Sequence, residues 1–225
     1  MSVEGRLQGR VAFVTGASRG LGAAIAIELA REGAHPIITG RTVGGLEATD
    51  DAIRSLGGQA TLLPLDLTEF DKIDHTAAAI FERFGKLDIL VGNAASLGML
   101  GPMGDISPAK WQKTLDLNLT SNWRLIRAFD PLLRRSEAGR ALFPTCAYGH
   151  DPIAYWNIYA VLKAALEMMV KVWEAELKLT KIKVALIDPG PMATRLRAEA
   201  FPGENPETQA RPEIAARMFV EAATQ

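Results

Sequence analysis

The chain alternates short apolar runs with longer segments of helical character, and this alternation restricts its fold more than any other feature. The six runs are rich in branched residues and are bounded by glycine, proline or asparagine, as buried strands are. We therefore expect an α/β fold: a doubly wound, parallel sheet of six strands in three α/β/α layers, with right-handed crossovers. The expected strands are residues 11–14, 36–39, 60–63, 87–91, 140–143 and 182–187, and the expected helices are 20–32, 44–56, 70–84, 108–134, 155–179 and 211–223.

The size and charge of the chain narrow the class of protein. A length of 225 residues suits one α/β domain, which we place at residues 1–225. The formal net charge of −1 argues against a broad electrostatic surface for nucleic acid or for an anionic membrane. Residues 1–11 are charged and polar and lack the apolar stretch of a signal peptide, and no apolar run is long enough to span a membrane. We therefore expect a cytoplasmic protein without a nucleic-acid or membrane partner.

The cysteine content excludes a disulfide framework, because Cys146 is the only cysteine. His150 and Asp151 follow it closely in the sequence, but these three residues are too few for a zinc site, and the prolines and glycine around them indicate a loop. We expect no metal and interpret Cys146 as a partly buried neutral thiol.

The first strand runs directly into a glycine-rich turn that opens the first helix, Thr15-Gly-Ala-Ser-Arg-Gly-Leu-Gly22. Glycines at such a turn let the backbone approach a pyrophosphate, and the helix N-terminus offers free N–H groups and partial positive charge to that anion. One alternative is a tight turn without a ligand. Another is the Gly-x-Ser-x-Gly elbow of a hydrolase, which residues 16–20 also match. That elbow normally follows several strands, whereas this turn follows the first one.

The residues after the second strand indicate which dinucleotide the turn would hold. An NAD site carries an acidic residue there, about 20 residues beyond the glycines. This sequence reads Thr39-Gly40-Arg41 instead, and Arg19 adds a second cation within the turn. A guanidinium can bind a 2′-phosphate in a bidentate manner, so we expect NADP(H) to be preferred over NAD(H).

A tyrosine and a lysine are spaced four residues apart in the last long helix, at Tyr159 and Lys163. This spacing places both side chains on one helix face. A nearby ammonium favours the phenolate and lowers a tyrosine pKa, which would make Tyr159 a usable general acid/base. A surface pair without function has the same spacing, so the motif gains weight only from its context.

Together these motifs resemble the short-chain dehydrogenase/reductase family, whose two hallmarks are this glycine turn and Tyr-x-x-x-Lys. The resemblance extends over about residues 8–196 and includes Asp66 in Pro-Leu-Asp-Leu-Thr, Gly92-Asn-Ala-Ala95, Asn118 in Asp-Leu-Asn-Leu, and Pro189-Gly-Pro-Met-Ala-Thr194. It implies a Rossmann-type fold and reversible hydride transfer between NADP(H) and a small-molecule carbonyl or alcohol, in a homodimer or homotetramer. Its implied catalytic residues are Asn118, Cys146, Tyr159 and Lys163. Its implied cofactor-binding residues are Gly16, Ser18, Arg19, Gly20, Leu21, Gly22, Arg41, Asp66, Leu67, Asn93, Ala94, Tyr159, Lys163, Pro189, Gly190 and Thr194.

The resemblance also assigns a role to each catalytic residue. Tyr159 would donate a proton to the forming alkoxide, and Lys163 would lower its pKa and bind the nicotinamide ribose. Asn118 would hold a water that links Lys163 to solvent. Asp66 would contact the adenine, and the segment ending at Thr194 would hold the nicotinamide carboxamide.

The sequence departs from the family pattern at the catalytic serine. The family places a serine 13 residues before the tyrosine, and Cys146 stands at that position here. A thiol is a weaker hydrogen-bond donor than a hydroxyl. Thr145 would be a substitute only if it turned inward, against strand alternation. Further departures are Pro144, Ala95, Leu162 and the absence of the seventh strand that usually follows.

These departures support a second hypothesis, a catalytically impaired NADP(H)-binding protein or sensor on the same fold. The loops around 95–105, 147–156 and 195–210 would determine the substrate, and Tyr148, Tyr155 and Trp156 point to an apolar or aromatic one. Residues 197–212, rich in proline and polar side chains, are expected to be either a mobile lid or a plain connection.

Overall fold

A computed structural model describes residues 5–225 and shows a six-stranded, all-parallel sheet in the order β3-β2-β1-β4-β5-β6. The strands are short and mainly apolar, and β1, β4 and β5 are buried throughout, as parallel strands covered on both faces are. Their bounds are β1 (Val11–Thr15), β2 (His35–Gly40), β3 (Thr61–Pro64), β4 (Ile89–Val91), β5 (Arg140–Pro144) and β6 (Lys183–Ile187). The expected three-layer, doubly wound fold is confirmed.

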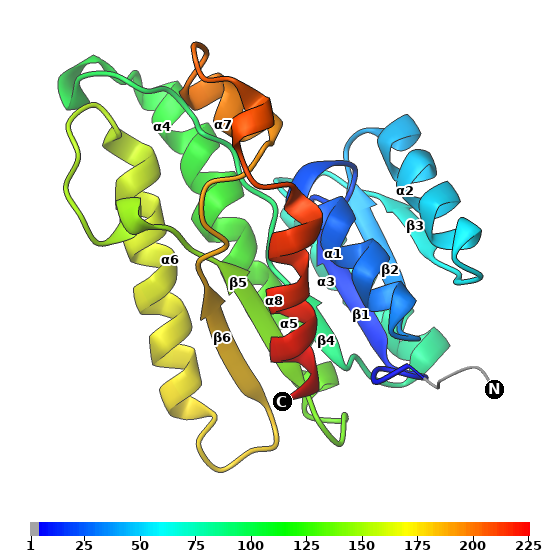
Figure 1. Ribbon diagram of the computed structural model, residues 1–225. Coiled ribbons are helices and arrows are strands. Elements are labelled where there is room, and N and C mark those ends of the chain that lie inside the picture. The colour runs from blue at the N-terminus through cyan, green and yellow to red at the C-terminus, as the bar shows by residue number, and fades with distance from the viewer. Residues whose placement is uncertain (1–4) are drawn as a thin grey trace.

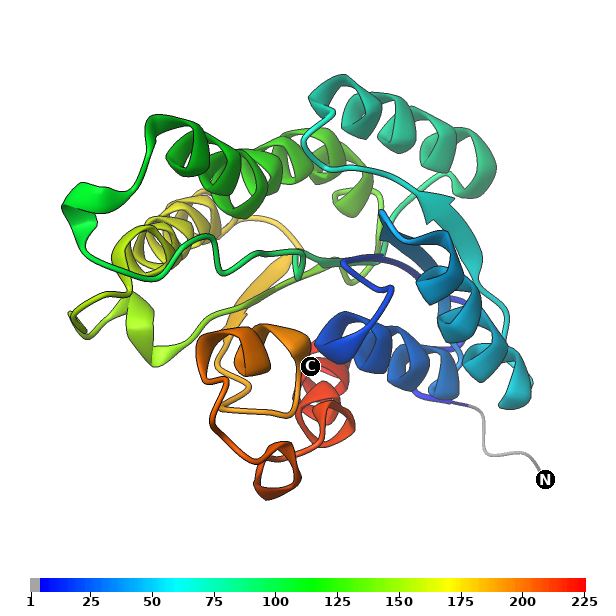
Figure 2. The same ribbon diagram turned by 90° about the horizontal axis from the view of Figure 1, so that it is seen from above.

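Helices cover both faces of this sheet, as the two perpendicular views show (Figures 1 and 2). One face packs against α1, α2 and α8, and the other against α3, α5 and α6. The bounds are α1 (Gly20–Arg31), α2 (Val43–Ser55), α3 (Phe70–Phe84), α4 (Pro108–Leu115), α5 (Ser121–Leu133), α6 (Asn157–Glu176), α7 (Arg195–Ala200) and α8 (Pro212–Thr224).

The prediction of one uninterrupted α-helix over residues 108–134 is wrong in detail. A π-helical turn, Asp116–Thr120, lies between α4 and α5. Ser107 caps the start of α4 by accepting a hydrogen bond from the Lys110 N–H at 3.4 Å, and Pro108 follows at the first helical position. Extra residues of this kind inside a helix occur often at functional sites.

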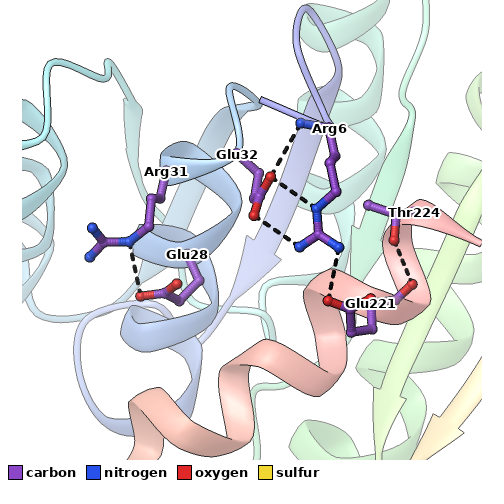
Figure 3. Close-up of polar contacts among 6 residues, drawn as sticks. All are labelled: Arg6, Glu28, Arg31, Glu32, Glu221 and Thr224. Atoms are coloured by element: carbon purple, nitrogen blue, oxygen red, sulfur yellow. Dashed lines mark hydrogen bonds and ion pairs between the residues drawn. The ribbon is translucent and has the colours of Figure 1, made fainter. Parts of the chain in front are cut away.

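The N-terminal loop is tied to both α1 and α8 by charged side chains (Figure 3). The Arg6 guanidinium donates to Glu32 Oε1 at 2.9 Å and Oε2 at 3.1 Å and also lies 2.8 Å from Glu221 Oε1. The contact between Arg6 and Glu221 joins residues that are 215 positions apart in the sequence. Residues 1–4, which belong to the predicted domain and to the polar N-terminal segment, lie outside the described residues. Within the part of the chain that the structure describes, no helix is both long and apolar enough to cross a membrane.

Candidate active site

A cleft of about 500 Å³ lies at the carboxyl ends of the strands. Residues that follow all six strands line it, including Gly16 after β1, Asn93 after β4 and Asp188 after β6. The strand order reverses between β1 and β4, and open α/β sheets bind their ligands at such a switch point. Every cofactor-binding residue expected from the sequence lines this cleft except Gly22, which lies behind the turn.

The glycine turn has the backbone shape expected of an anion site. Gly16 and Gly20 have φ angles of +66° and +56°, which a residue with a Cβ adopts only with strain. A Cβ on Gly16 would also lie 3.0 Å from the Ala94 Cα and from the Asn93 amide nitrogen. Arg19 precedes the first residue of α1, and no side chain caps that helix end. The N–H groups of the first turn of α1 are therefore directed at the cleft.

Thr15 holds the glycine turn to the segment after β4, a role that the sequence analysis did not assign. Its hydroxyl donates to the Val91 carbonyl at 3.0 Å and accepts from the N–H groups of Asn93 at 2.9 Å and Ala94 at 3.0 Å. The Asn93 side chain donates back to the Thr15 carbonyl at 2.9 Å. Thr15 is the first residue of the glycine-turn motif, but its hydrogen-bond partners are evident only because β1 pairs with β4.

Arg41 and Asp66 face each other at the end of the cleft beyond β2 and β3, with their charged atoms 3.9 Å apart. Burial would raise the pKa of Asp66, but hydrogen bonds from the Thr68 N–H and hydroxyl and the charge of Arg41 lower it overall. Thr39, fully buried and lining the same end, has a hydroxyl oxygen without a partner in the described residues. Arg41, more than half exposed, could exchange this long ion pair for a stronger anion.

Asn118 lies in the π-helical turn and is 5% exposed. Its amide oxygen accepts from the Ser96 N–H at 2.9 Å, and its amide nitrogen donates to the Ser96 carbonyl at 2.8 Å. Asn118 therefore lies beneath the cleft rather than in its wall, where it borders a small space together with Lys163.

Tyr159, Lys163 and Cys146 meet in the middle of the cleft, on α6 and on the loop after β5. Tyr159 is 6% exposed and packs against Cys146, whose side chain forms a hydrogen bond with the phenol. The Lys163 ammonium lies 5.8 Å from the centre of the Tyr159 ring and donates to the Pro144 carbonyl at 2.8 Å. The predicted catalytic pair is thus buried beside the residue that takes the position of the serine.

The expectation that Lys163 lowers the Tyr159 pKa does not hold in this structure. Burial raises the pKa of Tyr159, and the neighbouring Cys146 raises it further through its charge and its hydrogen bond. Burial likewise lowers the pKa of Lys163, while the charges of Cys146, Glu167 and Asp188 oppose that effect. The physical reason is desolvation, which disfavours both charged forms, and the lysine ammonium is directed at Pro144.

The two residues before the cysteine, Pro144 and Thr145, are both held by hydrogen bonds. Pro144 lacks an N–H, but its carbonyl accepts from Lys163, and the next N–H, of Thr145, pairs with the Ile187 carbonyl at 2.8 Å. The Thr145 hydroxyl donates to the buried Glu167 carboxylate. Thr145 therefore points away from the position of the missing serine, as strand alternation predicts.

The segment after β6 approaches the glycine turn from the opposite side. Gly190 has a φ angle of +70°, and its N–H donates to the Asp188 carboxylate at 2.9 Å. Thr194 caps α7 by accepting from the Arg197 N–H at 3.2 Å. The Thr194 methyl lies 3.5 Å from the position that a Cβ on Gly20 would take. The two loops thus enclose the centre of the cleft.

Aromatic side chains form the remaining wall. Tyr148 and Trp156 stack with ring centres 3.5 Å apart, and Phe201 lies 5.8 Å from Trp156. Arg197 lies over Phe201 at 3.7 Å, and Glu204 accepts from it at 2.6 and 2.7 Å. Phe201 and Arg197 belong to the substrate-loop region expected around residues 195–210. Tyr155 has a φ angle of +72° and is largely exposed.

The residues of the cleft fit a dinucleotide that carries an additional phosphate. The positive-φ glycines leave room for a diphosphate, Arg19 and Arg41 supply cations, and the Thr39 hydroxyl lacks a partner among the described residues. Across residues 5–225 no group of three or more His, Cys, Asp or Glu side chains could hold a metal ion.

Comparisons with known proteins agree with this geometry. Residues 10–205 match the sequence profile of the family described as short chain dehydrogenase. The oxidoreductase YciK of Escherichia coli K12 is 34% identical over 204 residues, which cover 89% of this chain and 81% of YciK. A short-chain dehydrogenase of Salmonella enterica serovar Typhi superposes with a TM-score of 0.94 at 32% identity, covering 99% of this chain and 93% of that one.

A second solved structure adds a ligand to the comparison. A protein from Shigella flexneri, solved as a complex with NADP, superposes with a TM-score of 0.94 at 32% identity and covers 98% of this chain and 93% of that one. The family profile alone matches most of the chain, and the two structures share its fold over nearly its whole length. The chain therefore belongs to the short-chain dehydrogenase/reductase family of oxidoreductases.

Proposed function

We propose that this protein is an NADP(H)-dependent oxidoreductase that interconverts a carbonyl and an alcohol, with Tyr159 as general acid/base. The observation that carries the proposal is the meeting of the glycine turn, the two arginines and the Tyr159–Lys163 pair in one cleft. The NADP complex of the Shigella flexneri relative supports the choice of cofactor. When bound, the nicotinamide would supply or accept the hydride.

The residues of the chain would bind the cofactor and transfer the proton. Gly16, Gly20 and the start of α1 would bind the diphosphate, and Arg19 and Arg41 the additional phosphate. A tyrosine is protonated at neutral pH, and burial raises the pKa of Tyr159 further, so the phenol is in the state that a proton donor to a carbonyl oxygen requires. Lys163 would orient the ribose of the nicotinamide. Asn118 would hold the water that resupplies the proton.

The aromatic wall supports an apolar or aromatic substrate. Tyr148, Trp156 and Phe201 offer ring faces, and the charge of Arg197 is offset by Glu204. An aromatic ketone should therefore bind more tightly than an aliphatic carbonyl that carries a carboxylate. Replacing Trp156 with alanine should raise the KM of the aromatic ketone about 5-fold, because one aromatic contact contributes about 1 kcal/mol.

Calorimetric titration with NADPH and NADH tests the cofactor assignment first. We expect tight NADPH binding, much weaker NADH binding, and a 10- to 100-fold loss of NADPH affinity in Arg41→Ala, since a hydrogen-bonded charge pair contributes about 1.5–3 kcal/mol. NADH affinity should be unaffected by that substitution. Equal loss for both cofactors, or no binding of either, would contradict the proposal.

Tyr159→Phe tests the chemistry separately from binding. The variant should still bind NADPH and should lose turnover of a reactive dicarbonyl by at least 100-fold, because general acid catalysis commonly contributes 10²- to 10⁴-fold. Normal turnover without the phenol would remove Tyr159 from the mechanism.

The second candidate function is an NADP(H)-binding protein or sensor of low activity. Two observations favour it: Cys146 stands where the family has serine, and burial raises the pKa of Tyr159 above the range suited to fast proton transfer. Robust turnover by the wild-type protein would exclude this candidate.

We also propose that the protein assembles as a homodimer or homotetramer. Met168 and Val172 on α6 are 62% and 52% exposed and lie four residues apart, so they share one exposed face of the helix. Light scattering during gel filtration would measure the mass in solution, and a monomer would contradict this expectation.

A further inference from the structure

Glu167 is a buried carboxylate that the proton transfer proposed above does not use. It is 3% exposed and lies on α6, one helical turn after Lys163 and two turns after Tyr159. Residues four apart share a helix face, so these three side chains follow one line along α6. Burial of a carboxylate is costly unless it is paired, so its partners indicate why it is there.

The partners of Glu167 come from its own helix and from the loop between β5 and α6. The Thr145 hydroxyl donates to Oε1, and His150 Nε2 lies 3.1 Å from the same oxygen. The Lys171 ammonium lies 3.7 Å from Oε2. A Cβ on Gly149 would lie only 2.8 Å from Oε1, so the loop backbone packs directly on the carboxylate. Glu167 therefore fastens both ends of residues 145–150 to α6.

The same short segment of chain carries the contacts of the catalytic groups. Pro144 accepts the hydrogen bond of the Lys163 ammonium at 2.8 Å, Thr145 binds Glu167, and Cys146 contacts the Tyr159 phenol. A shift of Thr145 would move both neighbours, because they are adjacent in an extended chain. The anchor on Glu167 thus acts on the lysine and on the cysteine at once.

Glu167 also acts on Lys163 through its charge. Burial lowers the pKa of the lysine, and the negative charges of Cys146, Glu167 and Asp188 raise it. Cys146 lies on the loop after β5 and Asp188 after β6, so Glu167 is the contributor on the same helix as the lysine. In a site where desolvation favours the neutral amine, such a charge helps to retain the ammonium.

His150 connects this buried carboxylate to solvent. Its side chain is 54% exposed, while that of Glu167 is 4% exposed. Protonation of a histidine adds a positive charge, and on His150 that charge would lie 3.1 Å from Glu167. The other charged groups facing Glu167 are Lys163 and Lys171, both on α6.

We propose that Glu167 is a positioning residue for Lys163 and for the loop that carries Cys146, and that His150 couples this carboxylate to the pH of the solvent. The relevance of this role to catalysis rests on the proposed function. The structural basis is independent of the proposed function: it consists of the placement of Glu167, its hydrogen bond to Thr145 and its contact with His150.

The first test uses the apoprotein and no substrate. Lysine labelled with ¹³C at Cε is titrated by NMR, and Lys163→Met identifies the signal of Lys163. We expect Glu167→Gln, which keeps the shape of the side chain and removes its charge, to shift the titration of Lys163 to lower pH. Glu174→Gln removes an exposed carboxylate from the same helix and should leave that titration unchanged. Identical curves for Glu167→Gln and the wild type, or equal shifts in both variants, would overturn the proposal.

His150→Gln tests the link to solvent and remains available if Glu167→Gln does not fold, because His150 is exposed. In the wild-type protein the Lys163 signal should show a second, smaller inflection, caused by the change of charge on His150. The inflection should be lost in His150→Gln. Its persistence in that variant would exclude His150 as the coupled group.

The anchoring role is tested by Thr145→Val, which removes the hydroxyl and keeps the charge of Glu167. We expect kcat with NADPH and a reactive dicarbonyl to fall about 10-fold, because small displacements of catalytic groups are costly. Thr145→Ser should restore the rate. An unchanged kcat in Thr145→Val would refute the anchoring role, whereas a wild-type protein without turnover would refute the proposed function and leave the NMR result to decide on Glu167.

Discussion

Under the proposed function, Cys146 would limit the catalytic power of the cleft, because it stands at the position where the family has a serine. The thiol is partly buried and hydrogen-bonds Tyr159, which raises the pKa of the phenol. Thr145 cannot replace the missing hydroxyl, since its own is bonded to Glu167. A weak donor beside a buried phenol is consistent both with a slow reductase and with a cofactor-binding protein.

Substitution of this residue separates the two functions. We expect Cys146→Ser to raise kcat on a reactive dicarbonyl about 10- to 100-fold, because a hydroxyl donor contributes about 1–3 kcal/mol more than a poor one. Cys146→Ala controls for the loss of the thiol and should be no faster than the wild type. Steady-state kinetics at saturating NADPH measure the effect. Equal and robust turnover by wild type and Cys146→Ser would show that the serine is not needed here.

At the scale of elements, the amino ends of the strands are held by a buried carboxylate, just as their carboxyl ends form the cleft. Asp88 precedes β4 and is 2% exposed. It accepts from the Val11 N–H at 2.9 Å at the start of β1, from Lys86 at 3.0 Å, and from the Ser136 hydroxyl after α5. Burial alone would raise the pKa of Asp88, but these hydrogen bonds lower it overall.

Asp88→Asn should destabilise the protein by about 1–3 kcal/mol at pH 7, because it leaves buried donors poorly matched. A carboxyl whose pKa is lower in the folded state stabilises the fold above its unfolded pKa, 3.8, and loses that contribution as the pH falls through the lower folded value. The difference between variant and wild type should therefore narrow below pH 3.8. Urea denaturation at pH 7 and pH 3 measures it.

Asp74→Asn is the matched control, since Asp74 is 41% exposed and lies 3.7 and 3.9 Å from two arginines. Its effect should stay below about 1 kcal/mol, as is usual for exposed ion pairs. A difference that persists unchanged at pH 3 in Asp88→Asn would show that the carboxylate charge is not what stabilises the sheet.

At the scale of the whole molecule, the last helix completes the core. α8 packs against α1 and covers the sheet beside it, although the family profile ends at residue 205 (Figures 1 and 2). Phe219 is fully buried between α8 and the sheet, and Ala216 and Ala223 allow close approach to α1. Because α1 begins at the glycine turn, this packing also supports the diphosphate end of the cleft.

Phe219→Ala should reduce the free energy of unfolding by about 3–5 kcal/mol, since removing a buried phenylalanine costs both its transfer energy and the cavity that it leaves. Met218→Ala is the control on the same helix, because Met218 is 45% exposed. Chemical denaturation measures both variants. A loss below about 1 kcal/mol for Phe219→Ala would show that α8 is not an integral part of the core.

By itself the sequence determined the class of fold and the outline of the cleft. Periodicity of branched apolar residues located all six strands to within two residues at either end, because buried parallel strands require continuous apolar runs. The glycine turn after β1 and Arg41 after β2 were predicted to belong to one binding site, and both line the cleft. The prediction was possible because parallel strands bring their carboxyl ends to one edge of the sheet.

Only the tertiary structure determined the local backbone conformation, the burial and the charge environment of the residues in and around that cleft. The π-helical turn at Asn118 has no proline or glycine to announce it, and it arises from packing and from the Ser96 backbone. The pKa of Tyr159 moved opposite to the local expectation, because desolvation depends on burial by residues distant in the sequence. In the sequence Glu167 is an ordinary polar residue of a helix, and its burial becomes evident only when the loop after β5 is seen to pack on it. Local patterns encode elements and their order, whereas burial and charge environment come from contacts that only the completed fold creates.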